Sequence, residues 1–181
     1  MLFRSKQDQF IEAVLNVNPN TVVLMNTGSP VEMPWVDRCP SILQVWLPGQ
    51  EGGHAIANVL FGVVNPSGKL PVTFPKKLED NPSYGHYPGD EKVFYNEGIY
   101  VGYRHYDTKN VEPLFPFGHG LSYTKFDYGP IAGPSIVSAG GKINFSFTLR
   151  NSGQRKGQEV VQCYIRRSEE HTSELQSRAY L

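Results

Sequence analysis

Two runs of aliphatic residues limit the possible folds of this chain more than any other feature of its sequence. They are TVVLMN at residues 21–26 and ILQVWL at residues 42–47. Neither run alternates apolar and polar residues, as a strand with one solvated face does. Each therefore predicts a strand that is buried on both faces, as in a parallel sheet.

Helical periodicity accompanies these runs. Residues 10–17 place apolar side chains on one side of a helix, and Pro19 ends it because proline disfavours helical geometry at the preceding residue. A second apolar stripe spans residues 55–60, and Gly62 supplies a stop. Residues 65–75 predict a turn and a short strand. This order predicts an α/β layer that begins abruptly at a helix, like the second half of a domain.

Composition supports a folded domain and narrows its partners. Of the 181 residues, 39% are hydrophobic and 12% aromatic, which suits a globular protein with a core. Seventeen basic and seventeen acidic residues give no net charge, so electrostatics favours neither nucleic acid nor an anionic membrane. No apolar run approaches the roughly 18 residues of a membrane helix, and the N-terminus lacks the apolar core of a signal peptide. We expect a protein that stays inside the cell, or one whose true N-terminus lies upstream.

The chain changes character at Leu78 and again near Tyr128. Residues 79–128 are dense in Tyr, Phe, Gly and Pro, which fits an aromatic loop region at a binding cleft or, as we favour, a long ordered connector packed across domains. Residues 143–150 alternate apolar and polar residues, and NSGQRKG predicts a turn before a partner strand at residues 160–165. This predicts the start of an antiparallel β-sandwich, a fold of about seven strands.

Four ordered motifs give the chain a close resemblance to a known family. They are NPNTVVLMNTGSPVEMPW, VWLPGQEGGHAIANVLFGVVNPSGKLPVTFP, YNEGIYVGYRHYD and EPLFPFGHGLSYTKFDY, within residues 7–165. In this order and spacing they resemble the C-terminal part of family 3 glycoside hydrolases, the β-glucosidase group. Cys163, where other members carry an aliphatic residue, is a minor departure.

The resemblance implies an architecture. Members of the family that the chain resembles have a (β/α)8-type barrel followed by an α/β sandwich domain and often by a fibronectin type III-like domain. Residues 1–124 would be the C-terminal half of the α/β sandwich domain, a mostly parallel sheet with flanking helices, plus its connector. Residues 125–166 would begin the all-β fibronectin type III-like sandwich. The N-terminal barrel domain would be the missing partner of the chain.

The resemblance also implies a reaction, the retaining hydrolysis of terminal β-D-glucosyl residues in β-glucosides or oligosaccharides. Retention needs a nucleophile and an acid/base, two carboxyl groups about 5–5.5 Å apart. In the family the nucleophile is a barrel aspartate, and the acid/base is a glutamate in a GE motif just upstream of the first helix here. Since no residue of this chain matches either motif, we assign it no catalytic, cofactor-binding or metal-binding residue, and no cofactor.

The resemblance and the expected truncation set further expectations for the isolated chain. We expect the fragment to be inactive, and poorly folded or aggregated, because a cut sandwich leaves open strand edges and unburied apolar surface. Family tendency favours a secreted or periplasmic parent.

Two glutamates are tempting substitutes for the absent carboxyl groups. Glu51 in GQEGG is either a buried carboxyl with a raised pKa or a helix-start residue that satisfies backbone amides, and we favour the second. Glu97 in NEG lies near Tyr100, Tyr103 and Arg104 in the sequence. We expect an ion pair or a hydrogen-bonded anchor there.

The histidines offer no metal site by their spacing. His54, His86, His105 and His119 are not spaced as metal ligands usually are. His119, in FGHGLSY, is expected to be a turn or packing histidine.

The remaining candidates are aromatic rings, thiols and a sequon. Trp35 and Trp46 are candidates for stacking on sugar rings, although Trp46, inside a predicted strand, is expected in the core. Cys39 and Cys163 are expected to be buried free thiols. Asn144-Phe-Ser is an N-glycosylation sequon that matters only if the protein is secreted.

The last residues hold an acidic–histidine cluster that imitates a metal or acid/base site: Glu169, Glu170, His171 and Glu174. Residues 167–177 match, without a mismatch, the one-frame translation of a common sequencing-library adapter. We therefore interpret residues 167–181 as not native and exclude them from fold and function.

Two other classes of function compete with a β-glucosidase fragment. A non-catalytic carbohydrate-binding or interaction module would be expected to contain a complete sandwich domain. A nucleotide-binding α/β domain would need a phosphate-cradling glycine loop between a strand and a helix, and GQEGG does not have that form.

Overall fold

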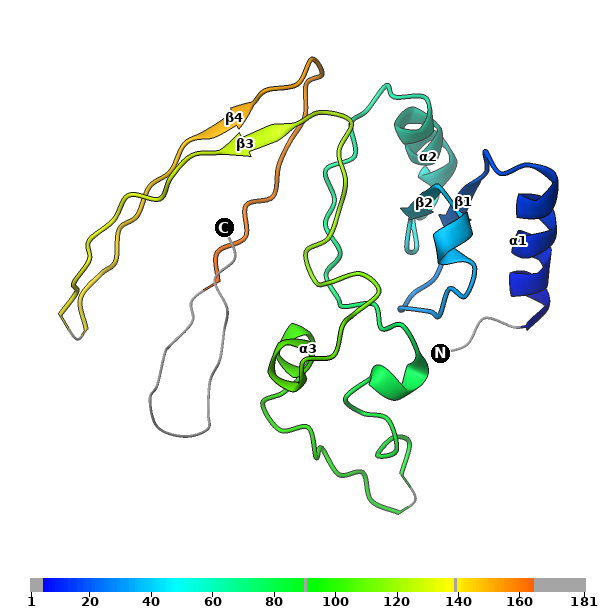
Figure 1. The fold of residues 1–181 in the computed structure, drawn as a ribbon, viewed down its shortest axis with the longest axis horizontal. Coiled ribbons are helices and arrows are strands. Elements are labelled where there is room, and N and C mark those ends of the chain that lie inside the picture. The colour runs from blue at the N-terminus through cyan, green and yellow to red at the C-terminus, as the bar shows by residue number, and fades with distance from the viewer. Residues whose placement is uncertain (1–4, 90, 139, 165–181) are drawn as a thin grey trace.

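The computed structural model describes residues 5–89, 91–138 and 140–164 (Figure 1). In chain order the elements are α1 (Ser5–Val17), β1 (Val22–Met25), the 3-10 turn η1 (Val36–Arg38), β2 (Ser41–Gln44), α2 (Gly52–Leu60), the 3-10 turn η2 (Leu78–Asp80), α3 (Tyr103–Lys109), β3 (Phe126–Tyr128) and β4 (Leu149–Asn151). In the described part of the chain, no helix has the length and apolarity needed to cross a membrane.

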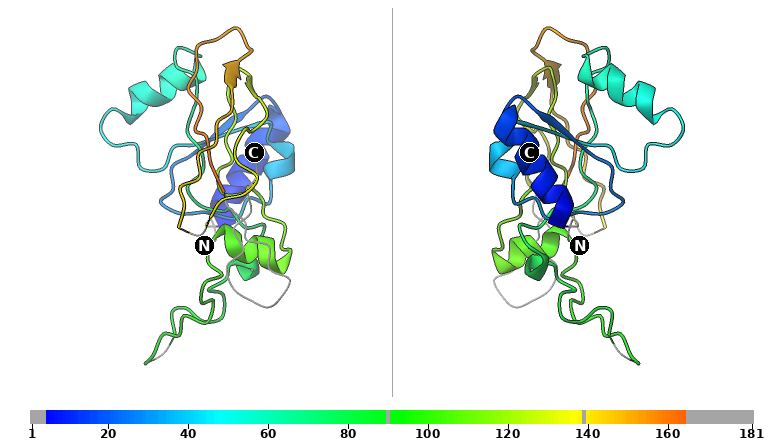
Figure 2. Two further views of the ribbon diagram at one scale, coloured as in Figure 1. Left: turned by 90° about the vertical axis from the view of Figure 1, so that its left-hand side faces the viewer. Right: turned by 90° about the vertical axis from the view of Figure 1, so that its right-hand side faces the viewer.

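The two aliphatic runs form a parallel strand pair, as predicted. In β1 and β2, Val23 lies opposite Ile42 and Leu24 opposite Leu43. Helix α1 lies on one side of this pair and α2 on the other (Figures 1 and 2). The prediction of burial on both faces is wrong for the described residues, because Leu24 is exposed. One face of the strand pair packs against the core, and side chains on its other face are accessible.

Helix α1 confirms the first helix predicted from periodicity. Asp8 lies in its first turn, where a negative charge interacts favourably with the positive end of the helix dipole. The helix ends at Val17, and a tight turn follows in which the Thr21 hydroxyl donates to the Asn18 carbonyl at 2.6 Å. That turn directs the chain straight into β1.

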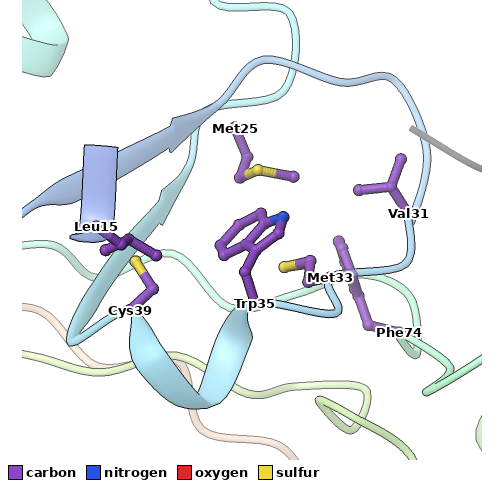
Figure 3. Packing of buried hydrophobic residues seen from close by; sticks show 7 residues of the cluster. All are labelled: Leu15, Met25, Val31, Met33, Trp35, Cys39 and Phe74. Carbon is purple, nitrogen blue, oxygen red and sulfur yellow. The ribbon is translucent and has the colours of Figure 1, made fainter. Parts of the chain in front are cut away.

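The buried core fills the space between α1, the strand pair and residues 31–39 (Figure 3). Its members are Leu15, Met25, Val31, Met33, Trp35, Cys39 and Phe74. Trp35 is fully buried, and its indole Nε1 donates to Asp8 Oδ1 at 2.9 Å, which satisfies the ring's one polar group. This bond ties the core to α1.

The short strand predicted in residues 65–75 does not form; an isolated bridge and a few hydrogen bonds to the connector take its place. Phe74 forms an antiparallel bridge with Phe115. Leu70 N donates to the His119 carbonyl, and Gly118 N donates to the Leu70 carbonyl, each at 2.8 Å. Residues 70–74 and 114–119 therefore lie side by side, and the connector returns to the α/β layer it left.

Helix α3 is a part of the connector that sequence periodicity did not predict. It begins after Gly102, whose φ of 55° favours glycine, and ends at Asn110 in a left-handed conformation. Within the helix, Tyr106 is the one buried residue. One buried side chain in two turns gives no apolar stripe, which explains why the pattern was invisible in the sequence.

The antiparallel β-ribbon, described for residues 126–138 and 140–151, differs from the predicted hairpin of residues 143–150 with 160–165. β4 pairs antiparallel with β3, with Tyr128 opposite Leu149, and Ala132 bridges Ser146 further along. Residues 160–164 form no strand with residues 143–150. Asn151 explains the difference: its amide Nδ2 donates to the Arg155 carbonyl and its Oδ1 accepts from the Thr124 hydroxyl, each at 2.8 Å. These bonds draw the turn across the start of β3.

Candidate functional site

The two glutamates proposed as candidate carboxyl groups lie in unremarkable surroundings. Glu51 immediately precedes α2, as predicted, but its side chain caps no helix amide. Its Oε2 instead lies 2.7 Å from His54 Nδ1, and both side chains are exposed. His54 follows Glu51 by three residues, a spacing at which side chains on a helix surface are neighbours. A buried Glu51 carboxyl is therefore contradicted.

Glu97 anchors the connector through its backbone alone. Its carbonyl accepts a hydrogen bond from Tyr100 N at 2.9 Å, which forms a local turn. Within the described residues its carboxylate makes no ion pair, with Arg104 or any other cation. Of the two predicted alternatives, the ion pair is therefore wrong, and the hydrogen-bonded anchor is present through the Glu97 carbonyl.

The histidines lie apart from one another and have separate environments. His86 Nδ1 lies 3.1 Å from the Asn96 amide. His119 packs its ring 5.1 Å from the Phe115 ring, which confirms a packing role, and burial followed by the Lys69 charge lowers its pKa. Burial and Lys109 likewise lower the pKa of His105, against a smaller opposing effect of Asp80. Among the described residues, no three His, Cys, Asp or Glu side chains gather as metal ligands.

The tryptophans are not platforms for a sugar ring. Trp35 belongs to the core, so that candidate role is contradicted. Trp46 packs against the core as predicted, with its ring 6.1 Å from the Phe74 ring. It does so from outside the strand, because β2 ends at Gln44 and Trp46 has a φ of 53°.

The thiols and the sequon have mixed outcomes. Cys39 is a buried free thiol, as predicted, and its Sγ donates to the Ser41 carbonyl at 3.3 Å. Cys163 is free but exposed, because residues 160–164 do not enter a sandwich core. Asn144 is exposed on the ribbon. The cluster at residues 169–174 lies outside the described residues.

The most conspicuous exposed feature is a projecting segment, described for residues 81–89 and 91–101, which we name the aromatic arm. It extends away from the α/β layer and the β-ribbon (Figures 1 and 2). Four of its aromatic side chains are exposed: Tyr84, Tyr87, Phe94 and Tyr95. Surface rings gathered on one projection are unusual, because aromatic side chains normally supply core or interface contacts.

Hydrogen bonds within the aromatic arm hold its shape. Near its start, Tyr84 N donates to the Asn81 carbonyl at 2.9 Å, and the Ser83 hydroxyl donates to Asn81 Oδ1 at 2.8 Å. The contact between His86 and Asn96 joins its outgoing and returning halves. A hollow of about 700 Å³ lies between these halves, lined by Phe94, His86 and Asn96 among others.

A second feature, which sequence reasoning missed, joins the α/β layer to the end of the ribbon. Lys69 Nζ lies 3.2 Å from Glu159 Oε1 and donates to the Gly120 carbonyl at 2.8 Å. The Tyr128 hydroxyl donates to the same Glu159 oxygen at 3.1 Å, and burial followed by this bond raises the pKa of Tyr128. The two charged side chains are only 15% and 11% exposed. We name residues 155–164 the clasp.

Further contacts fasten the clasp along its length. Arg155 donates to the Gly62 carbonyl at 3.1 Å and lies over the Tyr123 ring. At the other end, the Tyr164 ring meets the Tyr103 ring edge-on at a centroid distance of 5.5 Å. These partners are far apart in sequence and form no motif, so only the fold reveals them.

The described residues thus form an α/β layer, an aromatic connector and a β-ribbon. Residues 1–103 match the model of the glycosyl hydrolase family 3 C-terminal domain. The chain therefore belongs to this family, as its motifs indicated.

Curated relatives of the chain carry β-glucosidase names. The chain is 54% identical over 168 residues to "Thermostable beta-glucosidase B" of Acetivibrio thermocellus, covering 92% of this chain and 22% of that protein. It is 50% identical over 173 residues to a "Beta-glucosidase" of Rhizobium radiobacter, covering 91% and 21%. The chain spans about a fifth of the length of these relatives.

Solved structures agree with the fold. DesR, a β-glucosidase from Streptomyces venezuelae solved in complex with D-glucose, matches with a TM-score of 0.87 and 46% identity, covering 95% of this chain and 22% of that one. The β-glucosidase of Kluyveromyces marxianus, solved with glucose, matches with a TM-score of 0.92 and 38% identity, covering 99% and 22%.

Proposed function

We propose that the chain serves as the non-catalytic C-terminal portion of a retaining β-glucosidase, which removes terminal β-D-glucosyl residues from β-glucosides or oligosaccharides. The observation that carries this proposal is the 54% identity to a named β-glucosidase over 92% of the chain. The matching solved structures of β-glucosidases, each about four to five times as long as the match, support it.

The proposal divides the chain in two. Residues 1–124 belong to the α/β sandwich domain and its connector, and residues 125–166 begin a fibronectin type III-like domain. The change from a parallel strand pair to an antiparallel ribbon supports a boundary near residue 125. The hydrogen bond from Thr124 to Asn151 also supports this boundary, since it joins the residues just before β3 to the end of β4.

In this proposal both catalytic carboxyl groups come from the rest of the parent enzyme. Retaining hydrolysis needs an acid/base whose environment raises its pKa beside an ionised nucleophile. The exposed contact of Glu51 with His54 and the half-buried, locally anchored Glu97 support leaving both glutamates out of the catalytic pair. The chain instead supplies structure to the domain that would carry the acid/base.

A chimera tests the proposal. In the Acetivibrio enzyme, the segment matched by this chain is replaced by residues 1–166 of this chain, and hydrolysis of p-nitrophenyl β-D-glucoside is measured. We expect a soluble chimera to retain turnover with the β configuration of the first-released glucose. A soluble, folded chimera without turnover would contradict the proposal. A matched control carries Glu51→Gln, which should leave turnover unchanged.

A further inference from the structure

The aromatic arm exposes more ring surface than a free surface loop usually does. Tyr84, Tyr87, Phe94 and Tyr95 are between 50% and 82% exposed. A buried aromatic side chain covers about 150–250 Å², so together these four rings offer on the order of 500 Å². Interfaces between domains of one chain bury about 600–1,500 Å² in total, counted over both sides. The arm alone therefore provides one side of such an interface.

The arm is already ordered for docking. Tyr87 N donates to the Ser83 carbonyl at 3.2 Å, and Gly98 N donates to the Tyr95 carbonyl at 3.3 Å, so turns fix both stretches that carry rings. The contact between His86 and Asn96 prevents the two halves from separating freely. A surface that is ordered before binding loses less conformational entropy when it docks.

The chemistry of the arm favours a protein surface as its partner. The arm carries the acidic residues Asp90, Glu91 and Glu97 against the single basic residue Lys92, so its net charge of −2 does not attract polyanions. Tyrosine and phenylalanine are the residues enriched in the cores of protein interfaces. Most of the length of each relative lies outside the match, so the parent offers a large partner surface to which the arm would be tethered.

We infer that the aromatic arm docks on the rest of the parent enzyme, within the same molecule, and holds this domain against the catalytic one. This inference rests on the proposed function. Tethering makes such docking effectively intramolecular, so a modest patch is sufficient without high intrinsic affinity. A second copy of the chain and a carbohydrate are the alternative occupants, and the experiment below distinguishes them.

Cysteine labelling of the chimera tests the inference. Cys163 is first changed to Ala, and single variants Phe94→Cys or Tyr95→Cys are then made in the arm. The control is Lys142→Cys, an exposed charged position at the far end of the β-ribbon. Reaction with a maleimide dye is followed under native conditions and in urea. We expect labelling of both arm cysteines to be at least tenfold slower than labelling of the control in the native protein only.

Three other results would overturn the inference, and a fourth would refute the proposed function. Native labelling of the arm cysteines as fast as the control means that the arm is free, and if the same chimera hydrolyses p-nitrophenyl β-D-glucoside the proposed function still stands. Protection that disappears on dilution assigns the arm to a second copy. Protection that requires added glucose or cellobiose assigns it to carbohydrate. Loss of hydrolysis with retained protection would instead refute the proposed function.

Discussion

The ion pair between Lys69 and Glu159 should hold the clasp to the α/β layer, and its removal gives a local, measurable effect. In Glu159→Gln the shape of the side chain is kept, but the Lys69 ammonium is left with the Gly120 carbonyl as its remaining partner among the described residues. Removing one member of a fully buried pair costs about 3–5 kcal/mol. Because these side chains are still 15% and 11% exposed, water screens part of this, and we expect about 2–3 kcal/mol.

Hydrogen exchange of the chimera measures this loss at the joint itself. The amides of Leu70 and Gly118 bond across the joint next to Lys69, so they exchange when it opens. Since about 1.36 kcal/mol corresponds to a factor of ten, their exchange in Glu159→Gln should be roughly 30- to 160-fold faster than in the unmodified chimera. Peptides from α1, which is remote from the clasp, should be unaffected.

Two comparisons make this prediction refutable. Glu112→Gln removes an equivalent charge from the exposed pair with Lys76, and it should leave the Leu70 amide unchanged because solvent-exposed pairs contribute little. Adding Lys69→Met to Glu159→Gln removes the unpaired charge and should restore much of the protection. If Glu159→Gln and Glu112→Gln exchange alike, the clasp is not held by this pair and the reasoning is wrong.

Three further predictions concern buried and partly buried side chains in the chimera, and a fourth concerns the isolated chain. Burial and a nearby lysine lower the pKa of His119, so the folded state favours the neutral ring. The contribution of this ring to stability should be complete above about pH 6.5 and should be lost as the pH falls through the lowered pKa. Between pH 7 and pH 5, the urea midpoint of His119→Gln should therefore fall less than that of the unmodified chimera. Burial, followed by Asp80, raises the pKa of Tyr106 to about 12, so stability should be lost as pH rises from about 10 to 12, and less so in Tyr106→Phe; equal losses would contradict the burial of the phenol. Trp35→Ala should reduce stability by about 3–5 kcal/mol in urea unfolding followed by hydrogen exchange of β1, and a loss under 1 kcal/mol would show that the core is misplaced. Calorimetric titration of the isolated chain with glucose or cellobiose should show no binding, and measurable binding would favour the carbohydrate-binding alternative.

The α/β layer was predictable because its signals are local. The runs at residues 21–26 and 42–47 contain the aliphatic residues that a parallel pair needs; β1 forms within the first run, and β2 overlaps the start of the second. The helix before Pro19 likewise has its stripe and its stop in the sequence. Trp46 shows the limit of such signals, since β2 ends at Gln44 and the backbone turns left-handed at Trp46, although the run continues to residue 47.

The ribbon and the clasp were not predictable because side-chain bonds between distant residues determine them. Alternation in residues 143–150 correctly indicated extended chain, but it cannot specify the partner, and the Asn151 bonds to Thr124 and Arg155 direct β4 to β3. The Lys69–Glu159 pair has no pattern that a sequence scan could detect. The aromatic arm was recognised as an unusual composition, but its exposed rings depend on where the chain runs.

The most direct test of the central claim is a complementation assay of glucoside hydrolysis. The part of the Acetivibrio enzyme that precedes the match and the 181-residue chain are produced separately and together, and turnover of p-nitrophenyl β-D-glucoside is measured for each preparation. We predict that the chain alone shows no turnover above the uncatalysed rate, and that turnover occurs only when both parts are produced together. Turnover by the purified chain alone would contradict it, because catalytic carboxyl groups would then have to lie within these residues.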